Sequence, residues 1–256
     1  MSMKTLNIDD LVLATTGNKP FNDARNHPLM PQHYGGLGSF RWLICGKSGS
    51  GKTNIVISCI MQGLIKFDKL YLLVRDPTQS KYVLLQKWLN TLEKQFKETH
   101  EDSEDVSFYT VISNPDEVPD TDSFDSSIIN LVIIDDMLME KNQSKFIDYF
   151  VRGRQRSMDC IYLTQSYHAT DKTLRKQCDY FTIFEPNSKS DLVQLAKDHS
   201  LTYDFKEFKN LLGKATNSEN SFLFIDRRTP VKILQLRKGF DQVWNSAEQK
   251  YENLFD

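Results

Sequence analysis

The amino-acid sequence predicts an α/β fold with a mainly parallel central sheet flanked by helices. Between residues 40 and 184, short apolar segments that read as buried strands alternate with longer segments of helical character. A glycine-rich turn joins the first of these strands to the first helix. Further along, a continuous aliphatic run ends in two acids, which is typical of a central parallel strand buried on both faces.

The composition limits the class of protein. At 256 residues with 39% hydrophobic content, the chain is compatible with one large α/β domain or with a domain and a small appendage. No apolar run approaches the roughly 20 residues of a membrane span, and the N-terminus lacks a signal-peptide core, so we expect no membrane contact. The net charge of −2 excludes a polycation that coats nucleic acid, so any such contact must come from local patches gathered by oligomerisation.

The cysteines indicate the redox environment. The chain has four of them, widely spaced within apolar segments, namely Cys45, Cys59, Cys160 and Cys178. The sequence contains no C-x-x-C pair. We therefore expect reduced thiols in the core of an intracellular protein.

The glycine-rich turn predicts a phosphate-binding loop. It fits the pattern G-x-x-x-x-G-K-[ST] of nucleoside triphosphatases, with Gly46, Lys47, Ser48, Gly49, Ser50, Gly51, Lys52 and Thr53. A short apolar strand, Phe40 to Cys45, precedes the loop, and an apolar helix, Asn54 to Leu64, follows it. Because the motif requires this context, we expect a nucleoside triphosphate site rather than a chance glycine-rich turn.

The parts of this loop have separate expected roles. The backbone N–H groups and the positive end of the helix dipole would surround the β- and γ-phosphates. Lys52 would reach the β/γ oxygens, and the Thr53 hydroxyl would complete the shell of a Mg²⁺ ion. The loop therefore predicts that the nucleotide binds together with Mg²⁺.

The aliphatic run Ile128 to Ile134 delivers two carboxylates, Asp135 and Asp136, at the carboxyl end of a predicted central strand. Asp135 is placed to hold Mg²⁺ through water, and Asp136 is placed to polarise the attacking water. A glutamate is commoner at the second position, and aspartate is one methylene shorter. Two acids also follow apolar strands by chance, so it is their pairing with the phosphate loop that favours the functional interpretation.

The segments between these motifs predict the other elements. Ser80 to Lys97 has an apolar stripe at helical spacing, which more often faces a core than a partner. The stripe consists of Val83, Leu84, Trp88, Leu92 and Phe96. The other expected strands are Lys69 to Arg75, Val106 to Ile112, Met158 to Leu163 and Tyr180 to Phe184. The other expected helices are Lys141 to Phe150, Lys189 to Asp198 and Phe205 to Leu212.

The C-terminal part of the sequence predicts an antiparallel hairpin. Its two strands, Ser221 to Asp226 and Val231 to Leu236, flank a turn that contains Pro230. We expect three parts in the chain: a loop-rich segment at residues 1–39, a P-loop domain at 40–237, and a polar tail at 238–256. The tail would dock on a neighbour or stay mobile.

A third polar site, Thr164-Gln165, follows the strand Met158 to Leu163. Since all three polar sites follow strands, they should share the carboxyl edge of the sheet, where such folds bind ligands. The strand before Gln165 would adjoin the phosphate loop if it lay between the other two, but the strand order stays open. Gln165 would then sense the γ-phosphate or orient water, whereas the alternative is an amide that caps a loop.

Three arginines, Arg152, Arg154 and Arg156, lie just before this strand. One of them is a candidate arginine finger that stabilises transition-state charge in a neighbour's site, an effect worth roughly 10³–10⁵ in rate in known cases. The alternatives are a basic surface turn and a nucleic-acid contact. The pattern alone does not separate these interpretations.

Three motifs together resemble those of the poxvirus-type genome-packaging ATPases of the FtsK/HerA superfamily, which occur in double jelly-roll viruses and virophages. They are Gly46 to Thr53, L-V-I-I-D-D ending at Asp136, and Gly153-Arg154 before a strand that ends in T-Q-S-Y. The resemblance covers about residues 40–184. It implies a P-loop NTPase fold of the additional-strand (ASCE) type, with Gln165 as sensor and Arg154 as trans-acting finger. Gln155 replaces the histidine that often follows this arginine, which leaves Arg152 and Arg156 as competitors.

The function that this resemblance implies is that of a motor. A homo-oligomeric ring, a pentamer or hexamer, would use ATP and Mg²⁺ to pump double-stranded DNA into a preformed capsid. Its partners would be the DNA and the proteins of a capsid vertex. The expected location is the host cell cytoplasm, a virus factory or the virion.

Other proteins with a phosphate loop, such as GTPases and nucleoside kinases, need additional motifs that can be sought in the sequence. A GTPase switch would need an N-K-x-D motif after the acidic strand, and no such string follows it. A nucleoside kinase would need an arginine-rich lid and an acceptor pocket, and neither is identified. An ATP-binding capsid assembly factor that moves nothing stays open, and DNA-stimulated ATPase activity would separate it from a motor.

Overall fold

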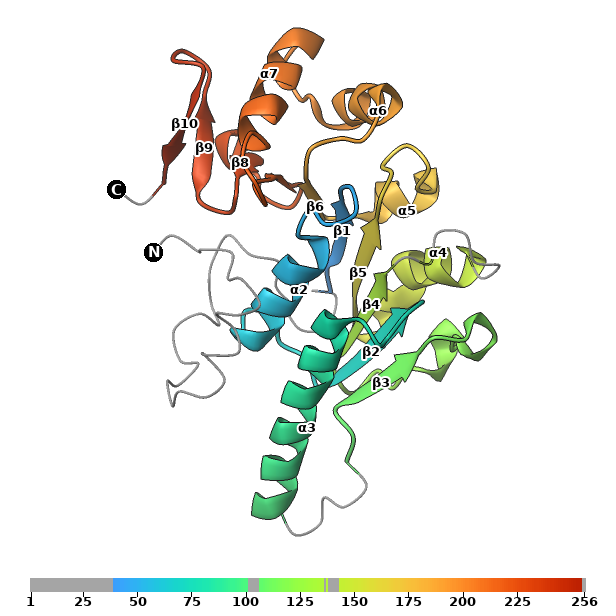
Figure 1. Ribbon diagram of the computed structural model, residues 1–256. Coiled ribbons are helices and arrows are strands. Elements are labelled where there is room, and N and C mark those ends of the chain that lie inside the picture. The colour runs from blue at the N-terminus through green and yellow to red at the C-terminus, as the bar shows by residue number, and fades with distance from the viewer. Residues whose placement is uncertain (1–38, 101–105, 136, 138–142, 255–256) are drawn as a thin grey trace.

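A single sheet of ten strands runs through the described part of the chain (Figure 1). The structure is a computed structural model that describes residues 39–100, 106–135, 137 and 143–254. The strand order is β10-β9-β8-β7-β6-β1-β5-β4-β2-β3. In chain order the strands are β1 (Arg41–Cys45), β2 (Lys69–Val74), β3 (Tyr109–Ile112), β4 (Asn130–Asp135), β5 (Met158–Thr164), β6 (Tyr180–Ile183), β7 (Leu223–Asp226), β8 (Leu236–Lys238), β9 (Gln242–Asn245) and β10 (Lys250–Asn253).

The first part of the sheet is parallel, as the sequence predicts. Strands β6, β1, β5, β4, β2 and β3 are paired in this orientation. β5 lies between β1 and β4, which settles the order that the sequence left open. In the register, Cys45 pairs with Thr164, and Asp135 pairs with Leu163. The phosphate loop, Gln165 and Asp135 therefore share one edge of the sheet.

The central strands contribute to a core on each face of the sheet. Leu43 and Cys45 of β1 belong to one hydrophobic cluster, and Trp42 and Ile44 belong to the other. This division follows from the two-residue period of a strand, which sends alternate side chains to opposite faces. With both faces apolar, such a strand has the continuous hydrophobic sequence from which it was predicted.

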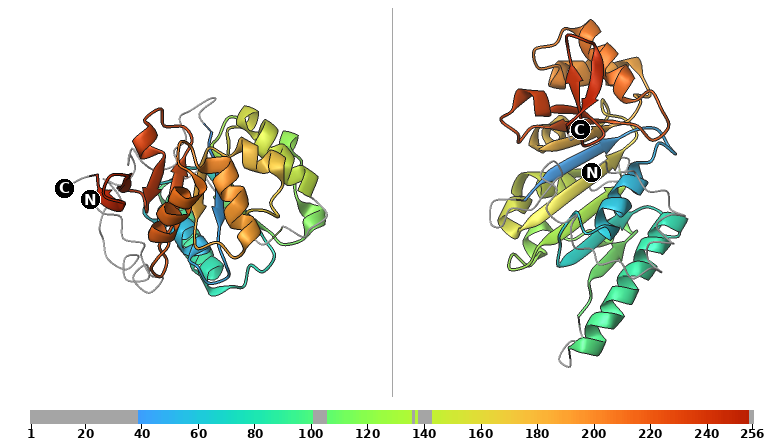
Figure 2. Two further views of the ribbon diagram at one scale, coloured as in Figure 1. Left: turned by 90° about the horizontal axis from the view of Figure 1, so that it is seen from above. Right: turned by 90° about the vertical axis from the view of Figure 1, so that its left-hand side faces the viewer.

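Helices cover both faces of the sheet. They are α2 (Lys52–Met61), α3 (Ser80–Thr99), α4 (Gln143–Arg152), α5 (Lys172–Gln177), α6 (Lys189–His199) and α7 (Phe205–Ala215). α2 and α3 contribute buried side chains to one cluster, and α4 to α7 contribute to the other. In Figure 1 and the right-hand view of Figure 2, α6, α7 and the C-terminal strands gather at one end of the sheet, and α3 lies at the other.

α3 forms where the sequence predicts a helix, but it buries an offset face. Its buried residues are Tyr82, Leu85 and Leu89. Leu84 and Trp88, which belong to the predicted stripe, are only partly buried against the same core. Each buried residue is next in sequence to a residue of the predicted stripe. The contact face is therefore rotated around the helix, and Leu84 and Trp88 lie beside its centre.

The C-terminal region forms more sheet than the sequence predicts. β7 pairs antiparallel with both β6 and β8, so the antiparallel C-terminal pairing is confirmed. The predicted second strand is misplaced, because residues Lys232–Leu234 form a 3₁₀ turn and β8 begins only at Leu236. The Asp226 carboxylate stabilises the intervening turn by accepting hydrogen bonds from the backbone N–H groups of Arg228 and Thr229.

The segment predicted as a tail contributes β9 and β10 to the same sheet. Trp244 and Tyr251 hold this pair of strands, with ring centroids 5.1 Å apart. The predicted boundary at residue 237 lies within β8, and most of the predicted segment 1–39 lies outside the described residues. The division of the chain into three parts stays a prediction.

Two further expectations concern the thiols and the membrane. All four cysteines are buried and none forms a disulfide, in agreement with the expected core thiols. Burial raises the pKa of both Cys45 and Cys160 to about 12. Within the described residues, no helix combines the length and apolar character that a membrane crossing requires.

A fully buried arginine joins α4 to the start of β5. The Arg41 guanidinium donates to the backbone carbonyl oxygens of Phe150 at 3.1 Å and Met158 at 2.8 Å. The turn between these two elements contains Gly153, and a Cβ atom there would lie 2.9 Å from Sδ of Met158 and 3.3 Å from Nη2 of Arg41. A methyl group at this position would press first on the buried Met158 side chain and then on Arg41, so this packing favours glycine.

We predict that Gly153→Ala destabilises the fold by about 1–3 kcal/mol, because the added methyl group overpacks this contact. The matched control is Gly213→Ala in α7, where an added Cβ atom meets nothing within 4 Å. That change should stabilise the protein by about 0.5–1 kcal/mol through the better helix propensity of alanine. Urea unfolding midpoints at an unchanged slope measure both effects. Equal shifts for the two variants would contradict the packing argument.

Candidate nucleotide-binding site

The phosphate loop connects β1 to α2 through left-handed backbone. Gly49 has a φ of 78° and Gly51 a φ of 100°, both in the region that favours glycine. A Cβ atom at Gly51 would also lie 2.8 Å from Oδ1 of Asn220. The motif therefore has glycine at positions 49 and 51 because the backbone is left-handed there, and this conformation leads the loop to the start of α2.

Lys52 is the first residue of α2, and its side chain folds back over the loop. Its Nζ donates to the carbonyl oxygens of Gly46 at 2.7 Å and Lys47 at 3.0 Å. The residue is 9% exposed. This arrangement places a positive charge beside the N–H groups of the loop, where phosphate oxygens would bind.

Thr53 and Asp135 are in contact, although 82 residues separate them in the chain. Thr53 Oγ1 donates to Asp135 Oδ2 at 3.2 Å, and the Tyr82 hydroxyl donates to the same oxygen. Hydroxyl and carboxylate oxygens are ligands that Mg²⁺ prefers. The two predicted metal residues therefore fit the ion, and Tyr82 of α3 orients the carboxylate.

Gln165 lines the same cavity as these groups. The cavity has a volume of about 410 Å³, and its lining includes Lys52, Thr53, Asp135 and Gln165. The side chain of Asn187 donates to the backbone carbonyl of Gln165 at 2.8 Å, which holds the segment after β5 in place. The structure thus brings the phosphate loop, the first acid and the glutamine together at one edge of the sheet.

Three residues of this cavity were missed from the sequence: Arg75, Gln79 and Lys81. Arg75 directly follows the buried strand β2. The signal that identified Asp135, a charged residue at the carboxyl end of a buried strand, could therefore also have identified Arg75. Lys81 lies in the first turn of α3, and its burial lowers its pKa while the Asp135 carboxylate opposes that shift. Arg75 and Lys81 add positive charge to the lining of this cavity, and Gln79 adds a neutral amide.

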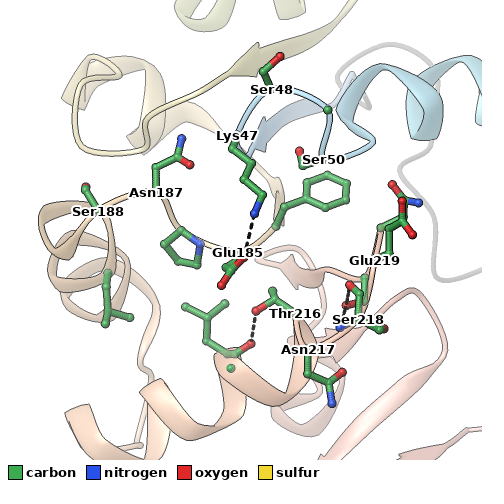
Figure 3. A pocket seen from close by; sticks show the side chains of 18 of the residues that line it. Lys47, Ser48, Ser50, Glu185, Asn187, Ser188, Thr216, Asn217, Ser218 and Glu219 are labelled. Atoms are coloured by element: carbon green, nitrogen blue, oxygen red, sulfur yellow. Dashed lines mark hydrogen bonds and ion pairs between the residues drawn. The ribbon is translucent and has the colours of Figure 1, made fainter.

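A larger cavity of about 830 Å³ also borders the phosphate loop (Figure 3). Its walls include loop residues 47–50, residues 184–189 after β6, and residues 216–221 after α7, and α6 and α7 add Leu192, Lys209, Leu212 and Gly213. Lys47 spans part of it and pairs with Glu185 at 3.1 Å, while the amides of Asn187 and Asn217 line its walls. A space of this size and polarity beside a phosphate loop can accept a ribose and a base.

The three predicted arginines lie at the opposite edge of the sheet. The 3₁₀ turn Gly153–Arg156 directly precedes β5, whereas Gln165 directly follows it. β5 has seven residues, so its ends are about 20 Å apart at roughly 3.3 Å per residue. Arg154 is therefore too far away to serve the phosphate loop of its own chain.

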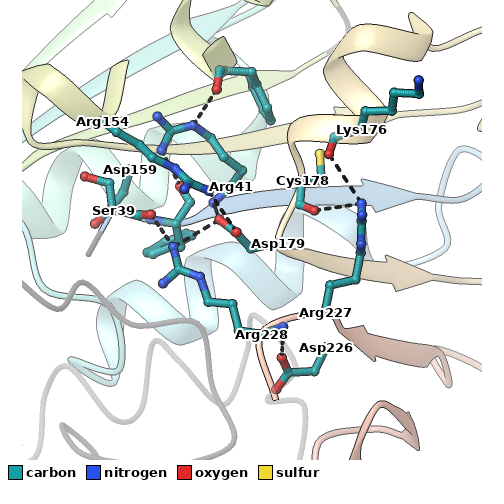
Figure 4. A network of polar contacts seen from close by, with 12 residues as sticks. Ser39, Arg41, Arg154, Asp159, Lys176, Cys178, Asp179, Asp226, Arg227 and Arg228 are labelled. Carbon is teal, nitrogen blue, oxygen red and sulfur yellow. Dashed lines mark hydrogen bonds and ion pairs between the residues drawn. The ribbon is translucent and has the colours of Figure 1, made fainter. Parts of the chain in front are cut away.

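Each of these arginines has a carboxylate partner. Arg154 Nη2 contacts Asp179 Oδ1 at 3.0 Å (Figure 4). Arg152 pairs with Asp148 at 2.6 Å within α4, and Arg156 pairs with Asp122 at 2.8 Å. Asp122 is 62% exposed and Asp148 is 31% exposed, whereas Asp179 is 13% exposed. Among the three, Arg154 is thus the one whose carboxylate partner is the most buried.

Comparison with protein families identifies the group of proteins to which this chain is related. The profile described as "Poxvirus A32 protein" matches residues 37–227, which is more than half of the chain. The chain belongs to this family. Membership of the poxvirus A32 family confirms the resemblance predicted from the three motifs, and with it the P-loop fold and the enzyme class, an ATPase.

Solved viral structures have the same fold as this A32-family chain. One is the genome packaging NTPase B204 from Sulfolobus turreted icosahedral virus 2 in complex with AMP, at 13% identity and a TM-score of 0.52, covering 78% of this chain and 96% of that one. Its complex with AMPPCP gives 14% identity and a TM-score of 0.51, with 78% and 97% covered. The DNA-packaging ATPase B204 from Sulfolobus turreted icosahedral virus gives 15% and 0.51, with 78% and 96% covered. A search of curated proteins found no match.

Family membership does not assign roles to single residues. Asp136, predicted to polarise the attacking water, lies outside the described residues. The roles expected for Thr53, Asp135, Gln165 and Arg154 have geometric support from the contacts above, but they stay predictions.

We predict that Lys52→Ala abolishes tight ATP binding and reduces hydrolysis by at least about 10²-fold, because the loop loses the cation aimed at the β/γ oxygens. Lys94→Ala is the matched control, since that ammonium is 79% exposed and pairs with Glu98 within α3, away from the phosphate loop. It should change either quantity by less than about threefold. Nucleotide titration and phosphate release measure both variants, and near-normal hydrolysis by Lys52→Ala would refute the assignment of the loop.

Proposed function

We propose that this A32-family protein is an ATP-driven translocase that packages double-stranded DNA into a preformed viral capsid. The observation that carries the proposal is the division of charged groups between the two edges of one sheet. The phosphate loop, Thr53 and Asp135 meet at the carboxyl edge, and Arg154 lies about 20 Å away at the amino edge. Because Arg154 does not reach the phosphate site of its own chain, we propose that it completes the site of a second copy, in addition to the Arg75 that already lines that site.

This geometry suits a closed ring. When subunits associate head to tail, the amino edge of each one meets the carboxyl edge of the next, and such heterologous contacts close into a ring when the rotation permits. A pentamer or a hexamer would satisfy this condition. The Arg154 guanidinium would then enter a neighbour's phosphate site as the γ-phosphoryl group leaves.

The described residues support a division of roles within one site. Lys52 and the loop N–H groups would bind the phosphates, and the ribose and base would occupy the cavity of about 830 Å³. Thr53 and Asp135 would hold Mg²⁺, which would neutralise phosphate charge when bound. Gln165 would orient the attacking water or sense the γ-phosphate, and Asp136 would accept the proton of that water.

We base the proposal of DNA and the capsid as partners on the family and on the viral proteins of the same fold. B204 is described as a genome packaging NTPase and a DNA-packaging ATPase. By analogy, we propose double-stranded DNA as the polymer moved, capsid vertex proteins as the docking partners, and the host cytoplasm, a virus factory or the virion as the location. The net charge of −2 requires that the DNA contacts come from basic patches assembled in the ring.

Two conservative substitutions test the roles of the acidic pair. Asp135→Asn should weaken Mg²⁺-dependent nucleotide binding by about tenfold, because an amide is a poorer ligand for the ion's waters. Asp136→Asn should keep Mg-ATP binding while it slows hydrolysis by about 10²–10⁴-fold, since an amide does not take the proton of the attacking water. Metal titrations and single-turnover rates separate the two, and swapped behaviour would reverse our assignment.

The decisive experiment measures the ATPase rate with and without double-stranded DNA, in the wild type and in subunit mixtures. DNA should stimulate the wild type. Arg154→Ala should bind ATP normally and lose about 10³-fold or more in turnover. Mixing Arg154→Ala with Lys52→Ala should restore activity, because some junctions then pair an intact loop with an intact arginine.

Other outcomes of this experiment distinguish the alternatives. An ATPase rate that DNA leaves unchanged would indicate a capsid assembly factor instead of a motor. If mixing with Lys52→Ala restores the ATPase rate of Arg152→Ala or Arg156→Ala but not that of Arg154→Ala, the arginine finger is Arg152 or Arg156 instead of Arg154. A variant that loses DNA affinity with a smaller salt dependence, but keeps turnover, would identify its arginine as a DNA contact.

A further inference from the structure

Asp179 is the residue on which the charged groups of the amino edge converge (Figure 4). It lies just before β6, and its side chain is 13% exposed. Its backbone is fixed from both sides, because its N–H donates to the carbonyl of Arg41 at 2.9 Å and its carbonyl accepts from the N–H of Arg227 at 2.9 Å. The carboxylate therefore has a position determined by the neighbouring strands.

The two carboxylate oxygens of Asp179 have different partners. Oδ2 accepts from the backbone N–H of Arg41 at 2.8 Å and from Nη2 of Arg228 at 3.1 Å. Oδ1 accepts from Nη2 of Arg154 at 3.0 Å. One oxygen thus anchors the carboxylate to the fold, and the other holds the predicted arginine finger.

Arg228 is itself part of the fold. Its Nη2 also donates to the carbonyl oxygen of Ser39, and its guanidinium lies 5.7 Å from the ring centroid of Tyr180. Its side chain is 24% exposed, whereas that of Arg154 is 40% exposed. The pair of arginines on Asp179 therefore consists of one that supports the carboxylate and one that projects from it toward solvent.

We propose that Asp179 is a positioning residue for Arg154: it holds the guanidinium at the amino edge, where it would enter the nucleotide site of a neighbouring copy. This inference rests on the proposed trans-acting role of Arg154. A long arginine side chain samples many rotamers, and a fixed carboxylate restricts these before the subunits meet. Arg156 pairs with Asp122, which is 62% exposed, and Arg152 pairs with Asp122 and with Asp148, which is 31% exposed, so both have carboxylate partners that are more exposed than Asp179.

The test uses Asp179→Asn in the full chain. Asparagine can still accept the backbone N–H of Arg41, but it loses the charge that holds Arg154. We expect ATP affinity within about twofold of wild type and a turnover about tenfold lower. Mixing the variant with Lys52→Ala should recover turnover, as for Arg154→Ala. The matched control is Arg227→Ala, an exposed neighbour that donates to the carbonyls of Lys176 and Cys178 and should leave turnover unchanged.

The double variant Arg154→Ala/Asp179→Asn separates positioning from general damage. If Asp179 acts through Arg154, the double variant has the turnover of Arg154→Ala alone, because its partner is already gone. Independent losses that multiply would overturn the inference. If the unfolding midpoint shows that Asp179→Asn does not fold, Arg228→Lys replaces it, because Arg228 supports the carboxylate through Oδ2. Arg228→Lys should lower turnover in the wild-type background and cause no further loss when Arg154→Ala is already present.

The outcomes also separate this inference from the proposed function. Full turnover in Arg154→Ala would remove the trans-acting role and the positioning role together. A severe loss in Arg154→Ala with normal turnover in Asp179→Asn would leave the ring mechanism intact and overturn only the positioning role of Asp179.

Discussion

The burial of β1, β5 and β4 on both faces is the constraint on which the rest of the molecule depends. A charged group between the sheet and its helices would lose its hydration without adequate compensation, so the chain places such groups where the strands end. Arg41 and Asp159 are fully buried exceptions: the guanidinium of Arg41 is met by several backbone carbonyls, and the carboxylate of Asp159 accepts the backbone N–H of Phe40. Charge is thereby concentrated at two edges of one sheet.

The two edges differ in chemistry because parallel strands have direction. At the carboxyl edge, strands lead into turns and helix starts, whose N–H groups suit phosphate, and the Thr53–Asp135 contact adds oxygen ligands there. At the amino edge, helix ends lead into strands, and the Gly153–Arg156 turn places guanidinium groups beside Asp179. A single chain therefore presents a site for anions at one edge and cations for such a site at the other.

Much of the nucleotide site could be predicted from the sequence because its signals are local. The phosphate loop is one continuous motif, and Asp135 and Gln165 each end a run of buried residues. The position of β5 between β1 and β4 was implied by the resemblance to additional-strand proteins but not by the residues themselves, since strands apolar on both faces have interchangeable sequences. The contacts of Tyr82 with Asp135 and of Asp179 with Arg154 depend on which elements become neighbours, and no local pattern records that.

The C-terminal strands show a different limit of prediction. β8, β9 and β10 have three or four residues each, too few to establish a two-residue period against the background of turns. Their place in the sheet depends on contacts made after folding, such as Trp244 against Tyr251. The sequence also predicts a strand at residues 231–235, because the apolar Val231 and Ile233 alternate with other residues. In the structure these two side chains are exposed, so their alternation does not reflect a buried face.

The buried cysteines have a practical consequence for studies of assembly. A maleimide reacts with a thiolate that it can reach, and the thiols of Cys45 and Cys160 are both enclosed and held protonated at neutral pH. The folded chain should therefore remain unlabelled without removal of any native cysteine. A single cysteine introduced on the surface would then carry a fluorophore or a cross-linker alone, so that distances between neighbouring subunits can be measured in a chain that is otherwise unaltered.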